Sequence, residues 1–127
     1  MAPESRTALI VEDNQANLDL AVYVLEHAGW KVLTAMNAQE ALQVLEAAVP
    51  SLILLDVQLP GCDGVTLLAE IRRKPALSEI PAIALTAHAM RGDRERFLAA
   101  GFNGYIAKPI KVKTFPLEVE SFLEGEG

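Results

Sequence analysis

The sequence predicts one α/β domain with a parallel sheet, because short apolar segments alternate along the chain with longer segments of helical periodicity. Two of the short segments, Leu9–Val11 and Leu52–Leu55, are nearly continuous apolar runs, which is typical of strands buried on both faces. The chain has 127 residues, of which 51% are hydrophobic, so it can bury a sizeable core without a disulfide or a metal. We expect five strands and five helices, joined by right-handed crossovers.

Short segments rich in Val, Ile, Leu and Ala are the expected strands. They are Thr7–Val11, Lys31–Ala35, Leu52–Leu55, Ala82–Leu85 and Gly104–Ala107. In an open parallel sheet, ligands bind in the crevice beyond the carboxyl ends of the strands. The residues that follow these segments are therefore the first candidates for a functional site.

Three of the expected helices have clear signals. The first has apolar residues at i, i+3, i+4 and i+7, namely Leu18, Ala21, Val22 and Leu25. Asn37, with Glu40 three residues later, predicts the start of the second helix. The third carries the stripe Val65, Leu68 and Ile71, and Pro75 closes it.

The last two helices are less regular. From Ala89 to Ala100 the helical pattern is weak, and Gly92 interrupts it. Pro116 falls within the first turns of the expected last helix, where proline removes a backbone hydrogen bond unless the helix begins late. With Thr114 as the N-cap, Pro116 is tolerated in the first turn, so we expect a shortened or shifted fifth helix.

Composition argues against several classes of protein. Seventeen acidic and eleven basic residues give a net charge of −6, which repels a nucleic-acid backbone. The single cysteine, Cys62, allows no internal disulfide, which fits a reducing compartment. Met1–Arg6 is polar, and the longest apolar run, Leu20–Leu25, is far shorter than the ~20 residues of a membrane span. We therefore expect a cytoplasmic protein that binds neither nucleic acid nor membrane directly.

Acidic residues end two of the expected strands. Glu12 and Asp13 follow the first strand, and Asp56 ends the third. If these strands are neighbours, the three carboxylates converge and raise one another's pKa, a conflict that a hard cation such as Mg²⁺ removes. Any one of these acids could equally be a solvated loop residue.

Thr86 ends the fourth strand and Lys108 ends the fifth. Together with the acids they suit phosphoryl transfer, in which a protein mainly positions groups and neutralises charge. A carboxylate can itself be the nucleophile and form an aspartyl phosphate. The sequence has neither a GxxxxGK[ST] loop nor a GxGxxG motif after the first strand. His27 and His88 are the only histidines, so a hydrolytic triad lacks material.

Four segments, ALIVEDNQANL, LILLDVQLPGCDG, IALTAHAMRGD and GYIAKPI, resemble the receiver domain of two-component response regulators. The resemblance extends from about Thr7 to Leu123, and Thr86 and Lys108 lie 30 and 52 residues after Asp56, as in the family. It implies a flavodoxin-like sheet of strand order 2-1-3-4-5. The implied domain is residues 7–123, between short tails at 1–6 and 124–127.

The resemblance also implies a role for each site residue. Asp56 matches the phosphoacceptor, and Asp13 and Asp56 match direct Mg²⁺ ligands. Glu12 matches an acid that acts through metal-bound water, and the main-chain carbonyl of Gln58 matches a further ligand.

Thr86 and Lys108 match the pair that contacts the phosphoryl oxygens. Tyr105 matches an aromatic whose rotamer follows the threonine, although an aromatic in a sheet could equally belong to the core. The Lys108–Pro109 bond matches one that is usually cis in the family.

Other residues have plainer interpretations beside the functional ones. His88 either tunes the phosphoryl lifetime or is an exposed loop histidine. Ala87 is small and would leave the acceptor accessible. We expect Trp30 to be a packing residue and Cys62 to be incidental, with no redox role.

The function implied by the resemblance is a phosphorylation-dependent switch, not an enzyme beyond its own phosphorylation and dephosphorylation. The implied donor is a sensor histidine kinase or a histidine phosphotransfer protein. We expect output by protein–protein contact with an unknown target, from a monomer or a phosphorylation-dependent dimer. The DNQANL stretch looks closest to receivers of hybrid kinases and to single-domain regulators.

A second function remains open, a Mg²⁺-dependent phosphatase or phosphotransferase with an aspartyl-phosphate intermediate. Such enzymes usually carry a general acid two residues after the nucleophile. Gln58 occupies that position here and cannot donate a proton as an acid.

Overall fold

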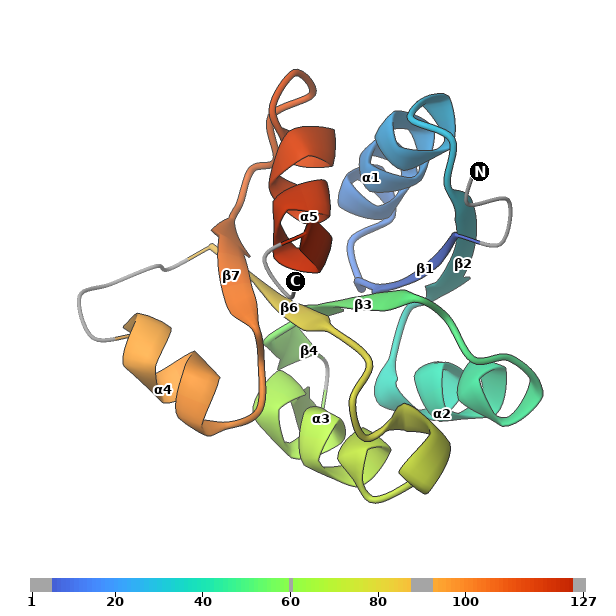
Figure 1. Ribbon diagram of the computed structural model, residues 1–127, viewed down its shortest axis with the longest axis vertical. Helices are drawn as coiled ribbons and strands as arrows, with labels where there is room; N and C mark the ends of the chain where they lie inside the picture. Colours follow the sequence, from blue (N-terminus) through green and yellow to red (C-terminus); the bar gives the residue numbers. More distant parts are fainter. Residues whose placement is uncertain (1–5, 60, 88–92, 125–127) are drawn as a thin grey trace.

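A parallel sheet of five strands organises the computed structural model, which describes residues 6–59, 61–87 and 93–124 (Figure 1). The strands are β1 (Thr7–Val11), β2 (Lys31–Ala35), β3 (Leu52–Asp56), β6 (Ala82–Thr86) and β7 (Gly104–Ala107). Their order is β2-β1-β3-β6-β7, and every neighbouring pair is parallel. Counted along the chain within this sheet, this is the order 2-1-3-4-5, so the expected flavodoxin-like architecture is confirmed.

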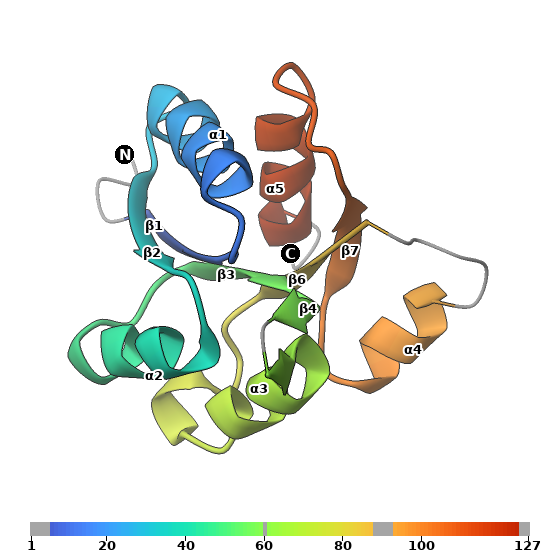
Figure 2. The ribbon, with the colours of Figure 1, turned by 180° about the vertical axis from the view of Figure 1, so that it is seen from behind.

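In the described part of the chain, five α-helices cover the two faces of the sheet. They are α1 (Gln15–His27), α2 (Ala38–Ala47), α3 (Gly64–Arg72), α4 (Asp93–Ala99) and α5 (Phe115–Glu124), and a short 3-10 helix, η1, spans Pro75–Leu77. Helices α1 and α5 lie on one face, and α2, α3 and α4 lie on the other, which is also evident from behind (Figure 2).

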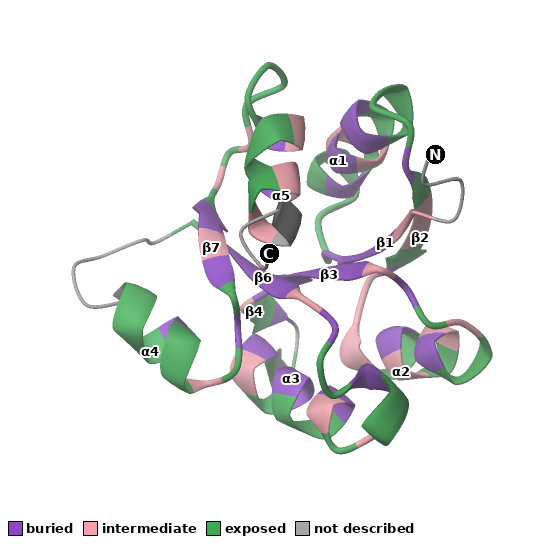
Figure 3. Cartoon of the chain, viewed as in Figure 1, coloured by how far each residue is buried: buried purple, intermediate pink, exposed green. Residues whose placement is uncertain are grey.

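The strand pattern divides the core between these two faces. Ala8 and Ile10 of β1 pack with the α1 and α5 side, whereas Leu9 and Val11 pack with the opposite side, because successive side chains of a strand alternate. The central strand β3 is buried along its whole length, and Figure 3 shows the buried sheet between exposed outer helix surfaces. Trp30 is buried in the α1 and α5 cluster, as expected of a packing residue.

The helix starts agree with the expected caps. The Asn37 side chain accepts a hydrogen bond from the Glu40 N–H, and the Glu40 carboxylate accepts one from the Met36 N–H. Helix α5 begins at Phe115, so Pro116 falls in the first turn, where its missing N–H is not needed. The Lys108–Pro109 bond is cis, as the resemblance implies.

Two features differ from the expectations. The chain after β3 forms a two-residue antiparallel hairpin, β4 (Gln58–Leu59) with β5 (Cys62–Asp63), which no apolar pattern indicated. The stripe expected for α1 included Val22, but Val22 is half-buried and Val24 is buried in its place. The expected helical segment from Ala89 begins outside the described residues, and α4 is described from Asp93.

Candidate functional site

The carboxyl ends of the central strands bring together the acidic residues singled out in the sequence. Strand β1 pairs with β3, so Glu12 and Asp13 come beside Asp56. Carboxylate oxygens of these three residues lie within 4.8 Å of one another. Glu12 and Asp56 are buried, whereas Asp13 is exposed. The expected convergence of three acids is therefore present.

Lys108 lies between the two buried acids. Its Nζ donates to Asp56 Oδ2 at 2.9 Å and to Glu12 Oε1 at 3.1 Å. The ion pairs are largely shielded from water, because each carboxylate side chain is 3% exposed and that of Lys108 is 15% exposed. Removal of the lysine would leave two buried carboxylates facing each other.

Main-chain N–H groups hold the remaining oxygens of both acids. The Gln58 N–H donates to Asp56 Oδ1 at 2.8 Å, and the Asn14 N–H donates to Glu12 Oε2 at 3.1 Å. Asn14 also caps α1, because its Oδ1 accepts from the Asn17 N–H at 2.9 Å. Every carboxylate oxygen of Glu12 and Asp56 thus has a donor, which fixes both side chains before any ligand arrives.

Burial and charge act on the protonation of these groups in opposite directions. Burial raises the pKa of Glu12, and the donors at Asn14 and Lys108 only partly offset that effect. Burial lowers the pKa of Lys108, but the hydrogen bonds to Asp56 and Glu12, together with the negative charges of these two acids, raise that pKa by more. Lys108 therefore remains a cation beside the acids at neutral pH.

Thr86 and Tyr105 lie on the β6 and β7 side of the site. Thr86 ends β6 and is buried, and its carbonyl oxygen accepts from the Lys108 N–H at 2.8 Å. Tyr105 is half-buried on β7, and its ring lies 5.9 Å from the ring of Phe97 on α4. The sequence anticipated both residues but gave no sign of the aromatic contact with α4.

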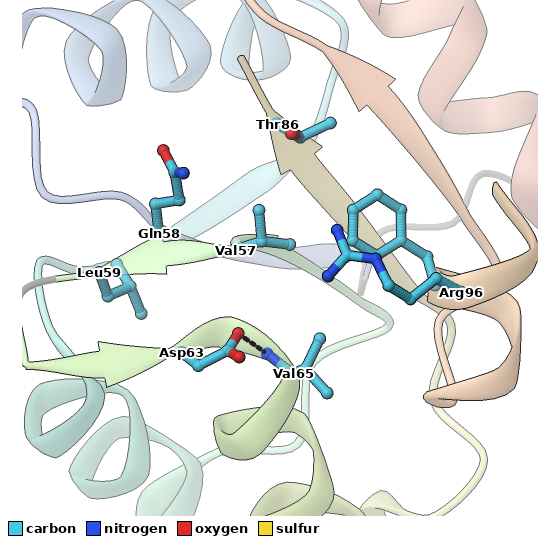
Figure 4. Close-up of a pocket in the computed structure, with 8 residues that line it drawn as sticks. Val57, Gln58, Leu59, Asp63, Val65, Thr86 and Arg96 are labelled. Carbon is cyan, nitrogen blue, oxygen red and sulfur yellow. Dashed lines mark hydrogen bonds between the residues drawn. The ribbon is translucent and has the colours of Figure 1, made fainter. Parts of the chain in front are cut away.

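A cavity of about 460 Å³ lies beside Thr86, between β4, the start of α3 and α4 (Figure 4). It is lined by Val57, Gln58, Leu59, Asp63, Val65, Thr86, Arg96 and Phe97. Asp63 caps α3 within it, because Asp63 Oδ1 accepts from the Val65 N–H at 2.9 Å (Figure 4). The space beside Thr86 is therefore bounded by α4 and by the segment that follows Asp56.

The donor set suits a hard divalent cation. Glu12, Asp13 and Asp56, which form the cluster among the described residues, all supply carboxylate oxygens, which are hard ligands. Exposed Asp13 leaves a side open to water, and Mg²⁺ usually retains several waters. His88 lies outside the described residues, as does the Cys62 side chain.

Charge patterns in the sequence do not reveal Asn14, because its contribution to the site is a main-chain donor. Its signal was available, since an asparagine directly before the first helical stripe is a typical N-cap. Gly64 was also missed, and only the hairpin reveals its contact with the acceptor segment.

A family model for the response regulator receiver domain matches residues 8–120. The chain belongs to this family. It is 38% identical over 118 residues to the polar-differentiation response regulator DivK of Brucella anthropi, covering 93% of this chain and 96% of that one. As a receiver domain of two-component systems, it is a phosphoacceptor signalling switch.

Solved structures of receiver domains resemble this one closely. A response regulator from Chloroflexus aurantiacus has a TM-score of 0.86 at 34% identity, covering 94% of this chain and 98% of its own. The receiver domain of the sensor histidine kinase PA1611 from Pseudomonas aeruginosa has a TM-score of 0.83 at 34% identity, with the same coverage. That receiver was solved with a magnesium ion coordinated in its active-site cleft. Among the described residues of this receiver, no helix has the length and apolar character to cross a membrane.

Proposed function

We propose that Asp56 is the phosphoacceptor of this receiver and that it takes its phosphoryl group from a phosphohistidine. The donor is a sensor histidine kinase or a histidine phosphotransfer protein. The observation that carries this proposal is the position of Asp56, which is buried between Lys108 and the Gln58 N–H and beside two further acids. A solvated loop acid has no comparable set of partners.

The transfer forms one bond and breaks one. A carboxylate oxygen of Asp56 attacks phosphorus, the P–N bond of the phosphohistidine breaks, and the electron pair returns to the imidazole nitrogen. Lys108 donates to Asp56 Oδ2, so its ammonium is already beside the position that the transferring phosphoryl oxygens will occupy. Thr86, at the end of the neighbouring strand, offers a hydroxyl to the phosphoryl group.

The acidic residues are proposed to hold Mg²⁺. Asp13, Asp56 and the main-chain carbonyl of Gln58 would be direct ligands, and Glu12 would act through a bound water. The magnesium-bound receiver of PA1611 supports this assignment. The cation supplies positive charge for the transferring phosphoryl oxygens. With a cation bound, the negative charges of Glu12 and Asp56 would be neutralised without Lys108. The lysine could then give up one carboxylate contact and bind a phosphoryl oxygen instead.

The signal is proposed to leave through Thr86 and Tyr105. A phosphoryl group on Asp56 draws the Thr86 hydroxyl toward itself, and the Tyr105 ring follows into the space that Thr86 leaves. Phe97, the ring partner of Tyr105, lines the cavity beside Thr86. Tyr105 contacts Phe97, so its movement alters the packing of α4. A protein partner that reads α4 and β7 would distinguish the two states.

The wider assignments form part of the same proposal. Residues 7–123 act as one receiver in the cytoplasm, and output is by contact with a protein target, from a monomer or a phosphorylation-dependent dimer. The receiver has no catalytic turnover beyond its own phosphorylation and dephosphorylation. Gln58 is exposed and carries no acid, which disfavours a phosphatase of the aspartyl-phosphate type.

The proposal is tested with acetyl phosphate and Mg²⁺ as the reagents. The wild-type chain should gain one phosphate by intact mass spectrometry, and Asp56→Asn should gain none. Asp63→Asn, in the neighbouring hairpin, is the matched control and should still be phosphorylated. Equal labelling of Asp56→Asn would refute the assignment, and multiple turnovers on small phosphoesters would favour the phosphatase instead.

A further inference from the structure

The acceptor segment Asp56–Gln58 contributes more than one group to the proposed site. It carries the Asp56 carboxylate, the Gln58 N–H that holds this carboxylate, and the Gln58 carbonyl proposed as a metal ligand. The path of this backbone therefore sets the geometry of the site. Any element packed directly against it influences the chemistry.

Gly64, the first residue of α3, is packed directly against this segment. The hairpin β4–β5 pairs Gln58 with Asp63, so the chain returns to the residues that directly follow Asp56. The Gly64 N–H then donates to the Val57 carbonyl at 2.9 Å. Helix α3 thus begins in contact with the residue that follows the acceptor.

The contact leaves no room for a side chain at Gly64. A Cβ there would lie 2.6 Å from the Asp56 carbonyl oxygen and 2.6 Å from the Val57 Cα. Both are main-chain atoms, so no change of rotamer relieves the overlap, and the backbone itself must shift. Gly29 and Gly61 differ, because each has a positive φ and a Cβ would meet nothing within 4 Å.

We infer that Gly64 is a positioning residue for phosphoryl transfer, because its missing side chain lets α3 fix the backbone of Asp56–Gln58. The inference rests on the proposed function, since it assigns a purpose to the acceptor and metal geometry. The Asp63 cap serves the same end, because its hydrogen bond to the Val65 N–H holds the first turn of α3 in place. A displaced first turn releases the acceptor segment.

The main test compares Gly64→Ala with Gly29→Ala. Calorimetric titration with Mg²⁺ alone gives the Kd, acetyl phosphate gives the phosphorylation rate, and thermal unfolding without Mg²⁺ gives the Tm. Gly64→Ala should weaken Mg²⁺ binding by about tenfold, as expected when a group that orients metal ligands is disturbed, and should also slow phosphorylation. Gly29→Ala should lower the Tm, because alanine is strained at φ +99°, and leave the Mg²⁺ Kd unchanged.

A second pair of variants covers the case in which Gly64→Ala does not fold. Asp63→Asn removes the negative charge and keeps a capping oxygen, whereas Asp63→Ala removes both. Asp63→Ala should bind Mg²⁺ about threefold more weakly than Asp63→Asn, because only the former loosens α3. Equal affinities of these two variants would overturn the inference.

The outcomes separate this inference from the proposed function. If the wild-type chain binds no Mg²⁺ and accepts no phosphate, the proposed function fails. If the wild-type chain does both and folded Gly64→Ala matches it in Kd and rate, only the positioning role of Gly64 fails.

Discussion

The two sides of the site are held in different ways. On the β1 and β3 side, Glu12 and Asp56 are buried, and the Lys108 side chain reaches them from the end of β7, so that all four carboxylate oxygens of the two acids have donors. On the β6 side, Thr86 borders a cavity of about 460 Å³. There α4 buries only Phe97 among its described side chains, whereas α1 buries four residues.

This difference assigns chemistry to one side and signalling to the other. Groups that are already oriented need no reorganisation when charge develops on a phosphoryl group. A helix with few buried contacts opens at a low free-energy cost, so it can respond to a change nearby. Phosphorylation can shift the equilibrium between two arrangements of α4 only to the extent that the phosphoryl group interacts more favourably with one of them.

The largest expected effect on stability comes from removing Lys108, the cation that holds Glu12 and Asp56. Without Mg²⁺, Lys108→Ala should lower the free energy of unfolding by about 3 kcal/mol, because two buried carboxylates lose their shared cation. Urea unfolding gives this value, and Lys111→Ala, an exposed lysine on the same loop, is the control. A loss of unfolding free energy no larger than that of Lys111→Ala would mean that the ion pairs of Lys108 with Glu12 and Asp56 do not stabilise the fold.

Mg²⁺ should have a similar effect in the opposite direction. Binding to the folded state alone raises the free energy of unfolding by about 2.7 kcal/mol at a hundred times Kd. Asp13→Asn should stabilise the metal-free protein, because it removes one of three clustered charges, and should weaken Mg²⁺ binding. A Tm indifferent to Mg²⁺, together with destabilisation by Asp13→Asn, would contradict the acid cluster as a cation site.

A third prediction sharpens the contrast by testing the side expected to move. Beryllofluoride with Mg²⁺ should change amide hydrogen exchange between Ala87 and Tyr105, and should leave α2 unchanged. Thr86→Ala should lose much of this change while still binding the phosphoryl mimic. An equal response in both proteins would mean that Thr86 is not the relay and that Tyr105 is a core aromatic.

The smallest effect is expected far from either side. Asn37→Ala removes the N-cap of α2 and should cost about 1 kcal/mol of stability. Mg²⁺ affinity and phosphorylation should not change. Urea unfolding gives the loss of stability, and calorimetric titration of the same preparation gives the Mg²⁺ affinity. A change in Mg²⁺ affinity would show that general destabilisation, and not local geometry, controls the site.

Most of the fold, and the acids, threonine and lysine of the candidate site, followed from local sequence signals, whereas Gln58 and Tyr105 were named only through the family resemblance. Continuous apolar runs such as Leu52–Leu55 indicated a buried parallel sheet, and the acids at strand ends indicated one shared edge. Asn37 with Glu40 identified the start of α2 because a capping box is a local interaction. The weak pattern before Ala100 likewise agrees with α4, in which Phe97 is the only buried residue among the described side chains.

Other features could not be predicted because they depend on contacts across the chain. The hairpin β4–β5 has two residues in each strand, too few to give a periodic pattern. The donors that hold Glu12 and Asp56 include main-chain N–H groups, which every residue type except proline carries. The requirement for glycine at position 64 arises from backbone atoms of Asp56 and Val57, which only the folded chain brings near.

The most direct test of the central claim is to locate the phosphate on the chain. Borohydride reduces an aspartyl phosphate to homoserine, so the receiver is phosphorylated with acetyl phosphate and Mg²⁺, reduced and analysed by tandem mass spectrometry. The account predicts homoserine at position 56 and at no other aspartate. Homoserine at Asp13 or Asp63, with position 56 unchanged, would contradict it.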